Sequence, residues 1–150
     1  MAHDYQNYIA GRWVDAKNGK RFTRENPGIG ATLCDVAEPA QVDALFAAAA
    51  QALGGLDILV NNAGIAGPTS PVEEIALGDW QRTIAVNLSG MFYCTRRAVP
   101  LLKAAGGGSI VNLSSVAGRL GFPLRTPYSA SKWAVVGLTN YWNRFTTALR

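Results

Sequence analysis

The sequence predicts an α/β fold in which helices cover a parallel sheet. Three short apolar runs alternate along the chain with segments of helical periodicity, and this alternation is typical of parallel sheets. Two of the runs, LDILVNN and SIVNLSS, are almost uninterrupted, as in strands that are buried on both faces. The three predicted core strands cover residues 31–36, 56–62 and 109–115.

A different rhythm precedes these strands. Two β-rich runs, residues 8–14 and 20–26, flank Asn18-Gly19, and an Asn-Gly between such runs predicts a β-hairpin. We therefore expect two parts, an N-terminal hairpin segment over residues 1–30 and an α/β domain over residues 31–150.

Three helices are expected between and after the strands. The first covers residues 39–53, the second begins with Asp79 as N-cap and ends before the glycines at 106–108, and the third begins at Thr126 and Pro127. The apolar stripes that we expect them to bury are Val42, Leu45, Phe46 and Ala49 in the first, Trp80, Ile84, Leu88, Phe92 and Val99 in the second, and Ala134, Leu138, Tyr141, Phe145 and Leu149 in the third.

Composition narrows the class of protein. The chain has 150 residues, enough for one hydrophobic core. Its net charge is 14 − 10 = +4, and the basic residues are scattered, which argues against a nucleic-acid surface. We find no apolar leader and no run long enough to span a membrane, so a cytoplasmic location is expected. Cys34 and Cys94 lack metal-site spacing, so no metal is expected.

Polar motifs lie where predicted strands end, which is where open α/β sheets bind ligands. They are NNAG at 61–64, the Ser114-Ser115 pair and YSASK at 128–132. Tyr128 and Lys132 are four residues apart and share a helix face. The ammonium favours the phenolate, so the pair can exchange a proton with a carbonyl or alcohol oxygen. Each motif alone is more often a turn or a surface pair.

The motifs taken together resemble the short-chain dehydrogenase/reductase family. LDILVNNAG, VNLSG, GSIVNLSSVAG and YSASK occur in this order, Ser115 lies 28 residues after Asn87, and Tyr128 lies 13 after Ser115. The resemblance covers about residues 34–139 and implies a Rossmann-like sheet, truncated at both ends. It implies an oxidoreductase that transfers a hydride between NAD or NADP and a small carbonyl or alcohol substrate, in a homodimer or tetramer.

The resemblance also implies catalytic roles for four residues. Tyr128 would be the general acid/base, and Lys132 would lower its pKa and bind the nicotinamide ribose. Ser115 would orient the substrate carbonyl. Asn87, in the second helix, would hold a water that relays protons.

Further residues would serve the cofactor if the resemblance holds. Asn61 would brace the central strand. Ala63 and Gly64 would let the cofactor approach the backbone closely. Asp35 and Val36 resemble the dipeptide that contacts the adenine ring.

The glycines at 28–30 resemble part of a phosphate-binding loop but stand too close to Asp35. Gly30 and Asp35 are only five positions apart, whereas a βαβ unit takes about 30 residues. We therefore interpret them as a turn.

Residues 7–33 instead resemble the N-terminal segment of the aldehyde dehydrogenase family, which suggests a chimera. An alternative function is a catalytically inactive remnant that acts as an interaction or scaffold domain.

Overall fold

The computed structural model describes residues 7–9, 12–14 and 35–147. Contacts between Cα atoms divide the chain into two compact units, Met1–Leu33 and Cys34–Arg150.

The first unit contains one antiparallel strand pair. Strand β1 (Asn7–Ile9) pairs with β2 (Arg12–Val14), with Tyr8 opposite Trp13. The prediction of one continuous strand over residues 8–14 is therefore wrong, because this stretch already folds back on itself. The second predicted hairpin strand, residues 20–26, and the glycines at 28–30 lie outside the described residues.

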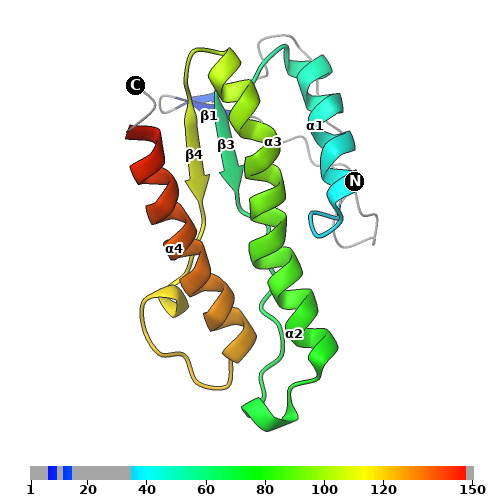
Figure 1. Cartoon of the computed structure of the whole chain (residues 1–150), viewed down its shortest axis with the longest axis vertical. Helices are drawn as coiled ribbons and strands as arrows, with labels where there is room; N and C mark the ends of the chain where they lie inside the picture. Colours follow the sequence, from blue (N-terminus) through cyan, green and yellow to red (C-terminus); the bar gives the residue numbers. More distant parts are fainter. Residues whose placement is uncertain (1–6, 10–11, 15–34, 148–150) are drawn as a thin grey trace. The chain divides into compact units, whose positions relative to one another are not determined.

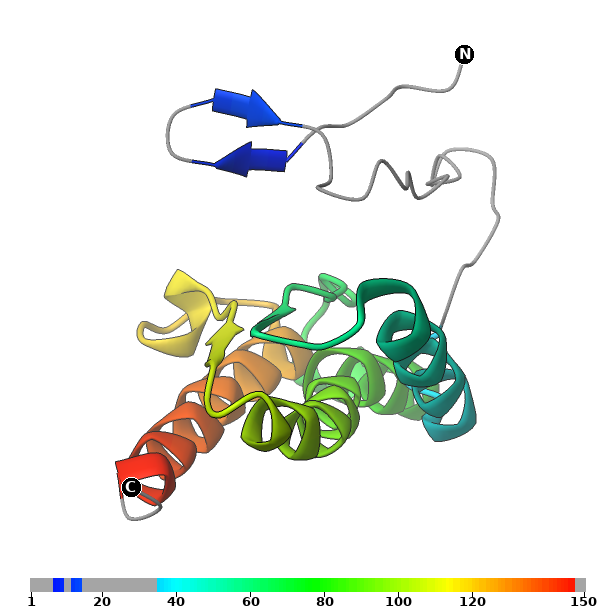
Figure 2. The ribbon, with the colours of Figure 1, turned by 90° about the horizontal axis from the view of Figure 1, so that it is seen from above.

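The second unit is a parallel strand pair with helices on one face (Figures 1 and 2). Strand β3 (Ile58–Asn61) pairs in parallel with β4 (Ser109–Asn112), as predicted. Leu59 and Ile110 face the helices, whereas the alternate residues on the opposite face are exposed, and Val60 is 54% exposed. In the part of the chain that the structure describes, no helix has the length and apolar character needed to cross a membrane.

The prediction of a core strand over residues 31–36 is wrong for the two residues of this range that the structure describes. Residues 31–34 lie outside the described part, and Asp35 and Val36 form a loop and turn. The Asp35 carboxylate accepts a hydrogen bond from the Ala37 N–H at 3.0 Å, and the Asp35 carbonyl accepts one from the Glu38 N–H at 3.0 Å. An Asp that binds the backbone two residues on favours a turn over a strand.

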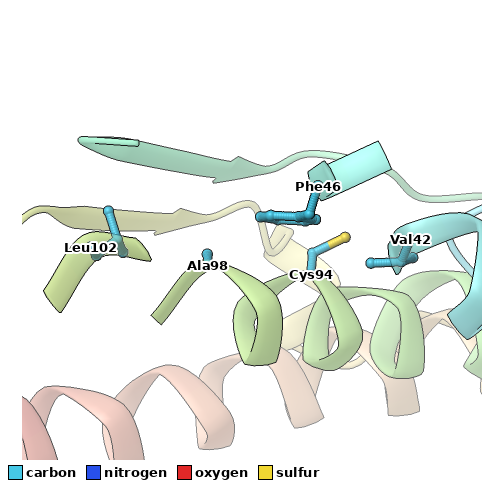
Figure 3. Packing of buried hydrophobic residues seen from close by; sticks show 5 residues of the cluster. All are labelled: Val42, Phe46, Cys94, Ala98 and Leu102. Atoms are coloured by element: carbon cyan, nitrogen blue, oxygen red, sulfur yellow. The ribbon is translucent and has the colours of Figure 1, made fainter. Parts of the chain in front are cut away.

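The hydrophobic core of this unit lies between α1 and α3. Helix α1 (Pro39–Leu53) has the predicted bounds, and helix α3 covers Gly90–Ala104. Figure 3 shows the buried cluster, which comprises Val42, Phe46, Cys94, Ala98 and Leu102. Leu45, predicted to be in the core, is exposed instead.

The predicted second helix is interrupted and begins earlier than expected. Helix α2 covers Leu77–Ile84, a π-helical turn covers Ala85–Ser89, and α3 follows without a break in the chain's direction. Asp79 is not the N-cap. It lies in the first turn of α2, and its carbonyl accepts a hydrogen bond from the Thr83 hydroxyl at 2.7 Å.

None of the described side chains in the predicted apolar stripes of the long helices is fully buried, and the side chains of Phe145 and Leu149 lie outside the described part. Phe92 on α3 is 46% exposed, and Tyr141 on α4 (Thr126–Thr147) is 59% exposed. The buried face of α4 instead has Pro127, Ser131 and Val135 at i, i+4 and i+8. Both helices have apolar side chains on more than one face, so periodicity alone selected the wrong one.

Gly90 provides a test of this packing. A Cβ atom at Gly90 would lie 2.8 Å from the Val36 carbonyl oxygen, so Gly90→Ala should destabilise the protein by about 1–3 kcal/mol. The matched control is Gly137→Ala on exposed α4 surface, where a Cβ meets nothing within 4 Å. Urea unfolding followed by circular dichroism measures both variants. Equal midpoints for the two would contradict the packing described here.

Candidate active site

The carboxyl ends of β3 and β4 are joined by a chain of buried and half-buried amides and hydroxyls. The Asn61 side-chain amide donates to Asn112 Oδ1 at 2.8 Å and to Thr95 Oγ1 at 3.1 Å. The Asn112 amide in turn donates to Thr139 Oγ1 on α4 at 3.1 Å. The Leu113 N–H continues the ladder to the Asn61 carbonyl. The loops that follow the two strands therefore leave the same edge of the sheet at a fixed separation.

Tyr128 and Lys132 meet above this edge, one turn apart on α4. Lys132 is 5% exposed, and its Nζ donates to the Leu113 carbonyl at 2.9 Å. The same Nζ lies 5.7 Å from the centre of the Tyr128 ring, within the range of a cation–π contact. An ammonium has three donors, and only this one bond is seen for it among the described residues. Lys132 can therefore bind a further acceptor beside the phenol.

A cavity of about 250 Å³ opens beside these two side chains. It is lined by Asn62, Gly64, Ile65, Ala66, Leu113, Ser114, Tyr128 and Lys132. A Cβ atom at Gly64 would reach to 3.5 Å from Lys132 Nζ, so glycine keeps this wall open. Ligand sites usually measure about 300–1,000 Å³, so this cavity lies below that range and has room for a small molecule or for one end of a larger ligand.

The wall formed by the loop after β3 is attached to the segment before α4. Arg125 Nη1 donates to the carbonyl oxygens of Ala66 and Gly67 at 3.3 and 3.2 Å. The Ser70 N–H donates to the Leu124 carbonyl at 3.0 Å. These contacts hold the loop against the first turn of the helix that bears Tyr128.

Asn87 lies directly behind the cavity, in the π-helical turn, and is 1% exposed. Its Oδ1 accepts from the Ile65 N–H at 2.7 Å, and its Nδ2 donates to the Ile65 carbonyl at 2.9 Å. Nδ2 also donates to Ser131 Oγ at 3.0 Å, and Ser131 donates to the Tyr128 carbonyl at 2.7 Å. A π-helical turn of this kind is frequent at functional sites.

The predicted residues therefore divide into four groups. Gly64, Tyr128 and Lys132 line the cavity, and Asn61 and Asn87 support it from behind. Ala63 is exposed and is not part of the lining. The remaining three predicted residues, Ser115, Asp35 and Val36, lie away from the lining.

Ser115 caps a short helix rather than lining the cavity. Its hydroxyl oxygen accepts the Ala117 N–H at 3.2 Å at the start of the 3₁₀ turn Val116–Gly118. The neighbouring Ser114 lines the cavity, and its hydroxyl donates to the Lys132 carbonyl at 2.8 Å. The Ser115 hydroxyl acts only as an acceptor in the hydrogen bonds described, so its proton is available to a substrate oxygen.

Asp35 and Val36 lie against α2 and α3. Asp35 Oδ2 accepts from Arg82 Nη1 at 2.9 Å, and Val36 packs against Gly90. The hydrogen bond from the Ala37 N–H, and then that from Arg82, hold the pKa of Asp35 below its ordinary value of 3.8. The Asp35 carboxylate is therefore already engaged within the protein.

Sequence reasoning assigned no role to Ser131, Asn112 or the Leu113 carbonyl. Ser131 stands inside the YSASK motif, three residues after Tyr128, and this spacing on a helix was the available signal. The backbone carbonyl of Leu113 leaves no signal in a sequence. Among the described residues, no three His, Cys, Asp or Glu side chains gather as a potential metal site.

Comparison with known proteins identifies similar sequences. A family model described as short chain dehydrogenase matches residues 8–146. The 3beta-hydroxysteroid dehydrogenase of Mediterraneibacter gnavus is 50% identical over 106 residues, which cover 71% of this chain and 38% of that protein. The 2-dehydro-3-deoxy-L-rhamnonate dehydrogenase (NAD(+)) of a Sphingomonas species is 50% identical over 105 residues, 70% of this chain and 42% of that protein. The chain thus spans less than half the length of these relatives.

Solved structures of a reductase and a dehydrogenase have a similar fold. Levodione reductase superposes with a TM-score of 0.69 at 35% identity, and NAD⁺-bound xylitol dehydrogenase with 0.69 at 31% identity. Each superposition covers 72% of this chain and 42% of the other. The expected Rossmann-like α/β fold is thereby confirmed.

The hydrogen bonds of the Asp35 carboxylate predict that the free energy of unfolding depends on pH. Because its pKa is lower in the folded protein, its contribution is complete above the unfolded value of about 4 and is lost as the pH falls through the folded pKa. The difference in unfolding free energy between wild type and Asp35→Asn should therefore shrink below about pH 4. Arg82→Gln should keep part of the effect, since the Ala37 N–H remains. A difference that stays constant between pH 6 and pH 3 would contradict this.

Proposed function

This chain belongs to the short-chain dehydrogenase family, and we propose that its second unit catalyses hydride transfer between NAD(P)(H) and a small carbonyl or alcohol. The observation that carries the proposal is the meeting of Tyr128 with the buried Lys132 at the edge of a cavity. A buried cation beside a phenol at the carboxyl end of a parallel sheet is an arrangement suited to acid–base chemistry.

Tyr128 would move the proton. In the reducing direction its hydroxyl donates a proton to the carbonyl oxygen, and in the oxidising direction its oxygen takes the alcohol proton. The Lys132 ammonium stabilises the negative charge left on the phenol oxygen. Ser115 would hold the substrate oxygen with its available hydroxyl proton. Asn87 would support the same turn of α4 from behind and hold a water for proton relay.

The cofactor, NAD or NADP, would supply the acceptor or donor of the hydride when bound. Lys132 would hold its nicotinamide ribose, because the remaining N–H donors of the ammonium could bind the ribose hydroxyls. Gly64 and Ala63 would permit close approach along the loop after β3, and Asn61 would hold that loop in place. Asp35 and Val36 would receive the adenine end, for which Asp35 must share its carboxylate with Arg82.

The inactive alternative has its own support. The cavity of about 250 Å³ holds only part of a dinucleotide, and the chain spans 38% of one relative's length and 42% of another's. If the chain does not bind the whole cofactor, an interaction or scaffold role would remain.

The aldehyde-dehydrogenase-like origin of residues 7–33 stays a prediction, as does the division at residue 30. A cytoplasmic location accords with the use of a freely diffusing cofactor.

We also propose that the chain forms a homodimer or tetramer through the exposed faces of α3 and α4. An apolar groove runs between these helices and is lined by Leu88, Ser89, Phe92, Tyr93, Ala134 and Leu138. Four of these six residues, Leu88, Phe92, Ala134 and Leu138, belong to the two apolar stripes that periodicity assigned to the core, and none of the four is fully buried. Covering it with a second copy would remove its apolar surface from water.

Phe92→Glu tests the dimer. We expect the wild-type protein to sediment as a dimer and Phe92→Glu as a monomer, because a buried carboxylate at the interface would be unpaired. Phe122→Glu changes an exposed phenylalanine outside the groove and should remain dimeric. A wild-type monomer at every protein concentration in sedimentation velocity would refute the interface.

Tyr128→Phe tests the reaction. Binding of NADH and NADPH to the wild-type protein is measured by titration, with cofactor fluorescence as the signal. Activity is then assayed with xylitol and a 3β-hydroxysteroid as probe alcohols. Removing the phenol should lower kcat/KM by about 10²–10⁴ without loss of cofactor binding. Tyr141→Phe removes a hydroxyl from an exposed tyrosine that lines neither the cavity nor the apolar groove, and it should leave kcat/KM near the wild-type value. Unchanged activity in Tyr128→Phe excludes its role, and no cofactor binding by the wild type favours the scaffold alternative.

A further inference from the structure

We propose that Ser131 is a positioning residue that fixes the Asn87 amide and so holds the Tyr128 turn of α4 against the loop bearing Gly64 and Ile65. Its catalytic consequence rests on the proposed function, whereas the structural link itself does not.

The direction of every hydrogen bond in this link is determined by chemistry. The Tyr128 carbonyl can only accept, so Ser131 must donate its one proton to it. The lone pairs of Ser131 are then left to accept from Asn87 Nδ2. The Ile65 N–H can only donate, so Asn87 must present Oδ1 to it. No flip of the amide preserves these bonds.

Burial makes the link costly to break. Ser131 is 0% exposed and Asn87 is 1% exposed, so water has little access to either side chain. Removing the Ser131 hydroxyl leaves one N–H of the Asn87 amide without its acceptor in a buried place. The amide would then be held by Ile65 alone, and its orientation would loosen.

The link joins three segments that the chain separates widely. Ile65 follows β3, Asn87 lies in the π-helical turn before α3, and Ser131 lies in α4. Ile65 lines the cavity on one side and Tyr128 on another. A side chain that links both walls helps to fix where the phenol lies relative to a substrate held against the opposing loop, and reaction rates depend steeply on such placement.

Ser129 provides a matched control two residues away. It is the same residue type on the same helix, and within the described part of the chain its buried hydroxyl has no hydrogen-bond partner. Ser129→Ala and Ser131→Ala therefore remove the same atom, but only Ser131→Ala breaks the link.

The first readout uses the cofactor-free protein. The side-chain amide of ¹⁵N-labelled Asn87 is assigned by the loss of its NMR signal in Asn87→Asp. We expect its protons to exchange with water at least about tenfold faster in Ser131→Ala and at an unchanged rate in Ser129→Ala. Unchanged exchange in folded Ser131→Ala would overturn the proposal. If Ser131→Ala does not fold, Ser131→Cys is measured instead, and failure of both to fold assigns Ser131 a purely structural role.

The second readout is kinetic, with the same probe alcohols. Ser131→Ala should lower kcat about tenfold and leave the KM for cofactor near the wild-type value, because the cofactor-binding groups are untouched. A faster amide exchange with unchanged kcat would refute positioning of catalysis. If the wild type shows no turnover, the proposed function fails, and the amide exchange still decides whether Ser131 fixes Asn87.

Discussion

The amide pair formed by Asn61 and Asn112 is the constraint on which the rest of the second unit depends. A two-stranded parallel sheet has few backbone hydrogen bonds, and strands can slip where side chains do not specify the register. A hydrogen bond of 2.8 Å between opposite asparagines, continued to Thr95 and Thr139, fixes both strand ends against α3 and α4. The loops that leave those ends then have one starting geometry, and the cavity follows from it.

The buried ammonium of Lys132 is the second determinant. Removing a charge from water costs several kcal/mol unless it is compensated, so a lysine that is 5% exposed must have partners. The Leu113 carbonyl and the face of the Tyr128 ring provide them. Because Leu113 directly follows β4, the compensation of the charge places the helix over the strand end. The contacts that compensate the buried charge of Lys132 are therefore also contacts between residues that line the cavity.

In the part of the chain that the structure describes, helices cover the β3–β4 sheet on one face only. Leu59 and Ile110 pack against the core between α1 and α3, while Ile58, Val60 and Val111 are exposed on the other face. The uninterrupted apolar strands suggested burial on both faces, and this expectation fails for the described part of the chain. Packing of the helices against one face of the sheet and the hydrogen bonds of Asn61 and Asn112 at the strand ends therefore stabilise the described part of this unit.

The sequence by itself determined the family, the bounds of α1 and the presence of two core strands, which are shorter (Ile58–Asn61 and Ser109–Asn112) than the predicted 56–62 and 109–115. It also singled out Asn87, Tyr128 and Lys132, which the fold brings to one cavity. These depend on motif order and on local periodicity, which are properties of neighbouring residues. Only the tertiary structure decided which faces of α3 and α4 are buried, that the second helix contains a π-helical turn, and that Ser131 links Asn87 to Tyr128. Those features depend on contacts between residues far apart in the sequence, such as Asn87 with Ser131, which are 44 positions apart, and no local pattern encodes such contacts.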